Sequence, residues 1–305
     1  MKILFMGTPD FSASVLRKLA SEHNVIAAVT GLDKPVGRGH RLMPSPVKVA
    51  AEELGIPVLQ FERVSRAVPE IRALGADLGV TAAFGQILSE EFLSVFPEGI
   101  INVHASLLPR WRGASPIQWA ILAGDKCTGI TVMKTVKEVD AGDMLLKKSV
   151  EIREGETAGQ LFDRLAELGG EAVCEAVDLI ETGRAVYTPQ NPDEVTKCGM
   201  ITKADGKINF RKSAVELDRF VRAMTPWPSA WCILGGRRIK VLELAKSDLC
   251  GECGTVLQAS PSQGLVIGCG DGSVRIAVLQ AEGKPAMSDT AFLAGNRIDT
   301  GEKTE

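Results

Sequence analysis

Strand-like and helix-like segments alternate through the first half of this 305-residue chain. Apolar runs typical of buried strands occupy residues 2–7, 24–30, 77–82, 99–103 and 129–135. Between them, apolar side chains recur with helical spacing over residues 10–19, 45–54, 67–74 and 116–122. This order of elements is typical of a mostly parallel sheet with helices on both faces. We therefore predict a Rossmann-like α/β domain.

The second half has a different pattern. A long helix is predicted over residues 157–182, and a proline-containing stretch typical of a linker follows it. One further helix (214–224) then precedes five short strands with glycine turns, at 230–234, 237–244, 255–259, 264–269 and 274–279. Five such strands predict a small OB-like β-barrel. We expect an α/β domain over residues 1–188, a linker over 189–206 and the β domain over 207–305.

Composition and cysteine usage indicate a cytoplasmic protein without a membrane partner. No apolar run approaches the roughly 20 residues that a membrane helix needs. The N-terminal run is too short for the apolar core of a signal peptide. The seven cysteines are an odd number scattered over the chain, which favours reduced thiols over a disulfide framework.

Two polar side chains, Asn102 and His104, stand at the end of the predicted strand 99–103. Residues two apart on a strand point to the same face, and open α/β sheets bind ligands at the carboxyl ends of their strands. The pair is either satisfied by neighbouring groups, as buried polar groups usually are, or directed at one reacting atom. The rigid turn that follows at residues 106–109 favours the second interpretation.

A second candidate segment, residues 139–145, is a tight turn with Asp140 and Asp143 at its ends. An aspartate in such a turn commonly bonds its own backbone. Alternatively, one carboxylate lies beside His104 and sets its proton affinity. The spacing does not choose between these interpretations, or between the two carboxylates.

Motifs for nucleotides and metals are missing from the sequence. The first strand leads into Gly7-Thr8-Pro9-Asp10-Phe11, which is not the dinucleotide fingerprint, and Pro9 removes an amide that a phosphate would use. Cys250 and Cys253 form a lone C-x-x-C, which we interpret as a turn with incidental thiols rather than half a zinc site. We therefore predict no bound metal.

The Asn102-x-His104 pair, the Ser-Leu-Leu-Pro turn and the later Asp-x-Gly-Asp resemble the formyltransferases that use 10-formyltetrahydrofolate. Residues 6–11, 37–39, 43–48, 104–116 and 224–231 resemble those members of the family that act on methionyl initiator tRNA. The resemblance runs nearly end to end. It implies transfer of a formyl group from 10-formyltetrahydrofolate to the α-amine of methionyl initiator tRNA, for translation initiation.

The resemblance also implies roles for individual residues. Asn102, His104 and Asp140 match the catalytic trio of the family, which selects Asp140 over Asp143. The residues that match its folate-contacting turn and the loop flanking the pterin are Ser106, Leu107, Leu108 and Pro109, then Phe84, Gly85, Gln86, Ile87 and Leu88.

Two basic segments are candidates for contact with tRNA. The first is a long loop after the second strand, with Lys34, Arg38, Arg41 and Lys48. Basic runs are usually solvated surface, but the resemblance makes this the loop that reaches the acceptor stem. The second segment, Arg237, Arg238 and Lys240, lies in the β domain and could follow an RNA backbone.

Two other functions stay open at this point. One is a formyltransferase for a small amine, such as glycinamide ribonucleotide or an amino-sugar nucleotide. The other is a non-catalytic RNA-binding module with a decayed α/β domain, against which the intact trio argues. We expect a monomeric enzyme of the bacterial cytoplasm that binds folate and methionyl initiator tRNA, and no DNA.

Overall fold

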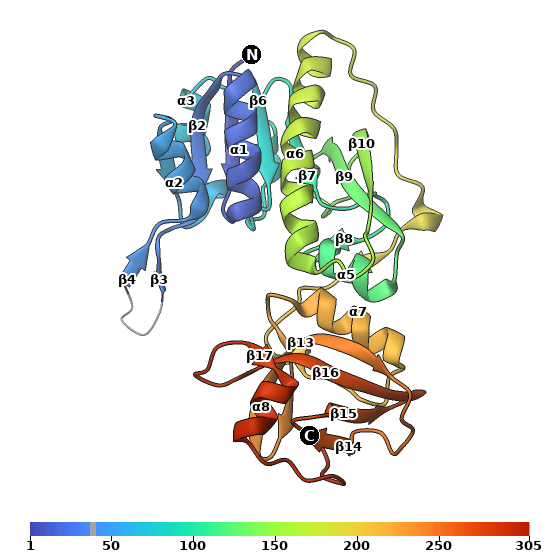
Figure 1. Cartoon of the computed structure of the whole chain (residues 1–305). Helices are drawn as coiled ribbons and strands as arrows, with labels where there is room; N and C mark the ends of the chain where they lie inside the picture. The colour runs from blue at the N-terminus through green and yellow to red at the C-terminus, as the bar shows by residue number, and fades with distance from the viewer. Residues whose placement is uncertain (37–40, 305) are drawn as a thin grey trace. The chain divides into compact units, whose positions relative to one another are not determined.

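A seven-stranded sheet forms the first half of the computed structural model, which describes residues 1–36 and 41–304. Its order is β10-β9-β7-β6-β1-β2-β5 (Figure 1). Five strands are parallel: β1 (Ile3–Gly7), β2 (Val25–Thr30), β5 (Val58–Gln60), β6 (Leu78–Ala82) and β7 (Ile100–His104). The antiparallel strands are β9 (Cys127–Lys134) and β10 (Met144–Glu151). The predicted mostly parallel sheet is confirmed, although β5 and β10 were not predicted.

Helices cover both faces of this sheet (Figure 1). Helices α3 (Val68–Ala73) and α4 (Glu90–Leu93) share a buried cluster with Leu4, Met6 and Ile100. Helices α1 (Asp10–Glu22) and α6 (Ala158–Glu181) meet over the other face. A Cβ at Gly169 of α6 would lie 3.2 Å from Val103 and 3.3 Å from both Phe11 and Val15. Glycine therefore lets α6 approach β7 and α1 closely.

The sequence predicted one long loop between β2 and α2 (Pro46–Glu53), and this prediction is wrong. An antiparallel ribbon pairs β3 (Lys34–Val36) with β4 (Arg41–Met43). Helix α2 then begins after Ser45, whose hydroxyl accepts the N–H of Lys48 at 3.0 Å. This cap satisfies one of the first amides of the helix. Residues 37–40 lie outside the described part of the chain.

The C-terminal domain is built on an antiparallel sheet, and all five predicted strands are present. The order is β12 (Ala230–Leu234), β13 (Arg237–Ser247), β16 (Gly272–Ala281), β15 (Gly264–Cys269) and β14 (Val256–Ser260), and β17 (Met287–Ser288) pairs with β16. Two helices accompany this sheet, α7 (Ala214–Met224) and α8 (Asp289–Gly295). The remaining elements are α5 (Pro116–Ala123), β8 (Arg112–Gly113), β11 (Lys197–Cys198) and the 3₁₀ turns η1 (Val64–Arg66), η2 (Pro192–Glu194) and η3 (Ala204–Gly206).

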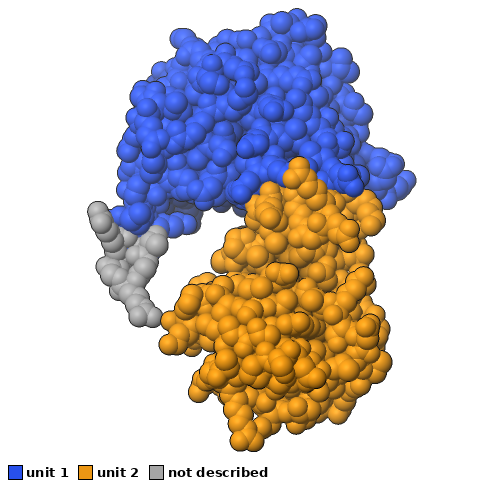
Figure 2. Space-filling view, viewed as in Figure 1, with its two compact units in different colours: residues 1–116, 127–151, 162–198 blue, residues 117–126, 152–161, 199–305 orange. Residues whose placement is uncertain are grey.

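The chain divides into two compact units, coloured separately in Figure 2. Unit 1 contains residues 1–116, 127–151 and 162–198, and unit 2 contains residues 117–126, 152–161 and 199–305. Trp119 and Leu122 of α5 pack against the buried cluster of the C-terminal sheet. Unit 2 thus includes two segments from within the predicted α/β domain, residues 117–126 and 152–161. The predicted boundaries, with the catalytic domain ending at residue 188 and the C-terminal domain beginning at residue 207, stay a prediction.

Over residues 1–36 and 41–304, no helix combines the length and the apolar character that a membrane crossing requires.

A buried ion pair joins α8 to the C-terminal sheet. Asp289 is fully buried, and its carboxylate accepts hydrogen bonds from Arg275 Nε at 2.7 Å and Nη2 at 2.9 Å. The backbone N–H of Leu265 donates to the same carboxylate at 2.9 Å. Burial raises the pKa of Asp289, but these bonds and that of Thr290 lower it more, to below the usual 3.8. The ionised carboxylate therefore stabilises the folded state.

We expect Asp289→Asn to lower the free energy of unfolding by about 2 kcal/mol at neutral pH, because it leaves the Arg275 guanidinium without its counter-charge. The Arg275 side chain is 38% exposed and can regain water, which limits the loss. Because the folded pKa is the lower one, this stabilisation is complete above the usual pKa of 3.8 and is lost as pH falls through the folded value. Urea unfolding at several pH values measures it. The exposed Arg297–Asp299 pair supplies the control, Asp299→Asn, with almost no loss.

Candidate active site

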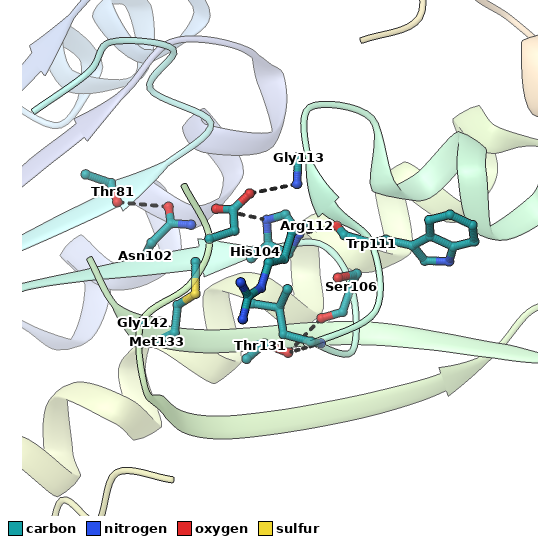
Figure 3. Close-up of polar contacts among 12 residues, drawn as sticks. Thr81, Asn102, His104, Ser106, Trp111, Arg112, Gly113, Thr131, Met133 and Gly142 are labelled. Carbon is teal, nitrogen blue, oxygen red and sulfur yellow. Dashed lines mark hydrogen bonds and ion pairs between the residues drawn. The ribbon is translucent and has the colours of Figure 1, made fainter. Parts of the chain in front are cut away.

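The predicted pair Asn102 and His104 lies at the carboxyl end of β7, beside β6. Thr81 of β6 is the register partner of Asn102 and donates from Oγ1 to Asn102 Oδ1 at 2.8 Å. This bond fixes the amide so that its NH₂ group faces away from Thr81, and Figure 3 shows the nitrogen directed toward His104. Asn102 thus offers an oriented hydrogen-bond donor at the end of the strand.

The imidazole of His104 is held between a carbonyl and a carboxylate. Its Nε2 lies 2.9 Å from the backbone oxygen of Trp111, and its Nδ1 lies 3.7 Å from Asp140 Oδ1. Because a carbonyl oxygen only accepts, Nε2 carries a proton in this arrangement. Nδ1 is left on the side of the carboxylate. The ring is 7% exposed, so it is largely shielded from water and faces the Asp140 carboxylate.

Asp140 comes from the segment between β9 and β10. Its Oδ2 accepts the N–H of Gly113 at 2.8 Å, which leaves Oδ1 facing His104. Its backbone has a φ of +53°, a region that is costly for residues other than glycine. Asp143 is exposed, and its backbone oxygen accepts the N–H of Lys134 at 2.9 Å. The structure therefore brings Asp140, and not Asp143, to His104.

The predicted folate-contacting turn, 106–109, is held by its own buried side chains. Ser106 Oγ donates to the carbonyl of Arg110 at 2.6 Å, and the hydroxyl of Thr131 joins the carbonyl of Ser106 to the N–H of Leu108. The side chains of Ser106, Leu108 and Pro109 are buried. Leu107 is half-buried over Gly129. This turn is well ordered by its neighbours, and its contact with folate stays a prediction.

The predicted pterin-flanking loop, 84–88, follows β6. Phe84 and Leu88 are buried in the cluster under α3 and α4. The side chain of Gln86 accepts the N–H of Val64 at 2.8 Å and donates to the carbonyl of Phe61 at 3.2 Å. Gly85 has a φ of +74°, and the side chain of Ile87 is 85% exposed. The loop is thus fixed at three points and presents Ile87 and the Gly85 backbone, so its role with the cofactor also stays a prediction.

Residues 190–198 contact the site, although the sequence predicted that all of them belong to a linker over residues 189–206. Thr196 Oγ1 accepts the N–H of Trp111 at 2.8 Å, and β11 pairs with β8 beside Gly113. Cys198 Sγ lies 3.4 Å from the carbonyl of Trp111. Burial raises the pKa of the Cys198 thiol, which favours its protonated form over the thiolate. These residues support the loop that holds His104 and Asp140.

Three of the four basic residues of the first segment are described by the structure, and their surroundings differ. Lys34 is exposed on β3, Arg41 is part of β4, and Arg38 lies outside the described residues. Lys48 donates to Asp33 at 2.8 Å and to Gln60 at 3.1 Å, so its charge is already paired. Contact of these residues with tRNA stays a prediction, with the weakest structural support at Lys48.

In the C-terminal sheet, Arg237, Arg238 and Lys240 are exposed on β13. Trp231 of β12 is the register partner of Lys240, and the guanidinium of Arg238 lies 4.0 Å from the centre of the Trp231 ring. Arg237 donates instead to Asn296 at 3.3 Å. Arg238, Lys240 and Trp231 therefore share one outward face, which we call the β12–β13 face.

Two family models match this chain: "Formyl transferase" over residues 1–177 and "Formyl transferase, C-terminal domain" over residues 200–297. Among solved structures, a HypX variant from Aquifex aeolicus covers 98% of the chain with 49% of its own length, at 19% identity and a TM-score of 0.67. The sugar 3N-formyltransferase WlaRD matches 93% of the chain with 99% of its own, at 16% identity and a TM-score of 0.67. At these identities the structures are similar in fold. The family models show that the chain belongs to the formyltransferases.

Full-length relatives define the branch of the family. A methionyl-tRNA formyltransferase from Geobacter metallireducens is 44% identical over 99% of this chain and 97% of its own length. One from Xanthomonas axonopodis pv. citri is 45% identical over 97% and 98%. The chain is therefore a member of the methionyl-tRNA formyltransferases within that family, which use 10-formyltetrahydrofolate as the formyl donor.

Proposed function

We propose that Asn102, His104 and Asp140 catalyse formyl transfer from 10-formyltetrahydrofolate to the α-amine of methionyl initiator tRNA. The observation that carries this proposal is the convergence of an oriented amide, an imidazole and a carboxylate at the end of β7. The relatives that match the chain end to end are named for this substrate. A structure of HypX, similar in fold, is described as a complex with tetrahydrofolic acid.

In this mechanism the neutral α-amine attacks the formyl carbon, and the carbonyl oxygen becomes a tetrahedral oxyanion. The Nδ2–H of Asn102 donates a hydrogen bond to that oxygen. A His104 protonated on both nitrogens keeps its Trp111 bond through Nε2 and donates from Nδ1. The Asp140 carboxylate lies 3.7 Å from Nδ1, on the side of the ring from which this hydrogen bond is donated.

Asp140 also receives the proton that the attacking nitrogen loses. Collapse of the intermediate breaks the bond between the formyl carbon and N10 of the folate, and N10 takes up a proton. The proton released by the amine thus balances the one gained by N10. Asn102, His104 and Asp140 are the groups that this scheme needs from the chain.

We further propose that the C-terminal domain binds the tRNA through Arg237, Arg238 and Lys240, and that Lys34, Arg38, Arg41 and Lys48 support binding from the other segment. The β12–β13 face offers two cations and one indole on one side of a sheet, which suits contact with phosphates and a base face. We also propose that the enzyme is monomeric, works in the cytoplasm and does not bind DNA.

The test of the function compares formyl acceptors. Purified protein with 10-formyltetrahydrofolate is offered initiator tRNA charged with methionine, the same tRNA uncharged, glycinamide ribonucleotide or an amino-sugar nucleotide. We expect formyl transfer to charged tRNA alone. Transfer to a small amine without transfer to tRNA would support the catalytic site but reject tRNA as the acceptor. Binding of tRNA without any transfer would reject the proposal that the protein is an enzyme.

Raising the salt concentration from 50 to 200 mM should weaken tRNA binding steeply, because each phosphate contact releases counterions. We expect Lys240→Ala to reduce the slope of log K against log salt by roughly 1. Filter binding or fluorescence anisotropy at several salt concentrations gives the slopes. Lys284→Ala, on an exposed turn after β16, should leave the slope unchanged. A flat salt response in the parent protein would contradict the electrostatic part of the proposal.

A further inference from the structure

One side chain, Gln190, joins the two halves of the active site. Its Nε2 donates to the carbonyl of Asp140 at 2.8 Å and to the carbonyl of Gly142 at 2.9 Å. Its Oε1 accepts a hydrogen bond from Arg112 Nε at 2.9 Å. Gln190 itself lies on neither segment, and it precedes the exposed turn η2. A glutamine amide can donate two hydrogen bonds and accept two. Gln190 donates both and accepts one in this bridge between the two segments.

The two bridged segments carry the groups that hold His104. Asp140, on the first segment, places Oδ1 3.7 Å from His104 Nδ1. On the second, the carbonyl of Trp111 binds His104 Nε2, and Arg112 follows directly. Gly113 then donates to Asp140. Gln190 therefore ties the acceptor on one side of the imidazole to the carboxylate on the other.

The backbone at Asp140 needs such support. A φ of +53° is sparsely populated for an aspartate and persists only where surrounding contacts determine it. Gly142 lies so close to β9 that a Cβ there would stand 1.9 Å from the carbonyl of Lys134. The turn is packed on one side, and the Gln190 amide binds the carbonyls of both Asp140 and Gly142.

We propose that Gln190 is a positioning residue that sets the distance between the Asp140 carboxylate and the His104 imidazole. The proposal rests on the proposed function of His104 and Asp140. Gln190 reaches the reacting groups only through Asp140 and Arg112, so its loss should lower kcat and leave KM for both substrates nearly unchanged. Misplacement of a catalytic group by about 1 Å can cost 10²-fold in rate.

The test uses full-length Gln190→Ala and Gln190→Glu, with Asn191→Ala as the matched control. Asn191 is the next residue, and its side chain bonds to Asp193 and Glu194 of η2. We expect Gln190→Ala to lower kcat by roughly 10- to 100-fold, with both KM values within about twofold. Hydrogen exchange in the peptide covering residues 138–143 should accelerate in this variant and stay at the parent rate in Asn191→Ala.

Gln190→Glu adds a pH signature. The ionised carboxylate can still accept from Arg112 but has no proton for the carbonyls of Asp140 and Gly142. The protonated carboxyl regains one donor, so the ratio of variant to parent kcat should rise as pH falls. A purely structural defect would lower the ratio by a constant factor.

Several outcomes would overturn the proposal. They are a kcat within twofold of the parent enzyme, a rise in KM without a fall in kcat, or a Gln190→Glu ratio that does not change with pH. Exchange of residues 138–143 is measured without substrate, so it tests the tether even where the parent enzyme proves inactive. If the parent enzyme proves inactive, the proposed function is rejected. Faster exchange in Gln190→Ala would then still support the role of Gln190 in holding residues 138–143. Unchanged exchange in Gln190→Ala would reject that role.

Discussion

Replacing His104 by alanine should lower kcat for formyl transfer by a factor on the order of 10² to 10⁴, the usual contribution of a positioned acid–base group. His104 is the one imidazole that the structure places beside Asn102 and Asp140 among residues 1–36 and 41–304. Its removal leaves Asn102 as the remaining donor to the oxyanion and leaves Asp140 facing no ring. Single-turnover transfer to charged initiator tRNA measures the loss directly.

The control for this experiment is His23→Gln. His23 follows α1 and lies 4.0 Å from carboxylate oxygens of Asp178 and Glu181 on α6. It should retain kcat, with any cost confined to stability. Thermal melting and tRNA binding of the His104 variant should match the parent protein. Transfer by His104→Ala at more than a tenth of the parent rate would contradict the role assigned to the imidazole.

The second large effect is expected for Asp140→Asn. An asparagine oxygen can still accept the N–H of Gly113, so the loop keeps its anchor while the negative charge is lost. Without that charge the buried His104 ring faces no carboxylate at Nδ1, and the proposed proton acceptor for the attacking amine is absent. We expect kcat to fall by roughly 10² to 10³. Rates measured across the pH range of stability would show it.

Asp143→Asn is the matched control, because Asp143 lies in the same turn with its side chain exposed. It should stay within about twofold of the parent enzyme. Similar losses in both variants would indicate that the turn as a whole matters rather than the Asp140 carboxylate. A full rate in Asp140→Asn at every pH would reject its role.

The parallel core of the fold could be predicted because its strands are buried on both faces and are therefore continuously apolar. Strand β10 escaped detection for the opposite reason. Lys147 and Lys148 interrupt its apolar pattern, and its residues alternate between partly buried and exposed positions. The ribbon β3–β4 was missed because Pro35 and the nearby glycines read as a loop.

Some residues of the candidate site could likewise be predicted from the sequence, and others could not. Asn102 and His104 follow from the period of a strand, which sequence spacing shows. The choice of Asp140 over Asp143 depends on a positive φ and on the N–H of Gly113, and only the family resemblance pointed to it. Gln190, Thr81 and Thr196 act through bonds to residues distant in sequence, so no local pattern marks them. The pairing of Lys48 with Asp33 and Gln60 is of the same kind.

Because α5 belongs to unit 2, the chain cannot be divided at a single position into two fragments that each keep their own buried core. A fragment ending at residue 198 would keep Trp119 and Leu122 but lose the cluster that covers them. The complementary fragment would lack two pieces of its own interior, residues 117–126 and 152–161. Residues 199–305 are therefore not a separable part of the chain, because unit 2 also contains residues 117–126 and 152–161. A chimaera that exchanged unit 2 between relatives would have to carry three separate stretches of sequence together, and a single recombination event near residue 198 would not exchange the whole unit.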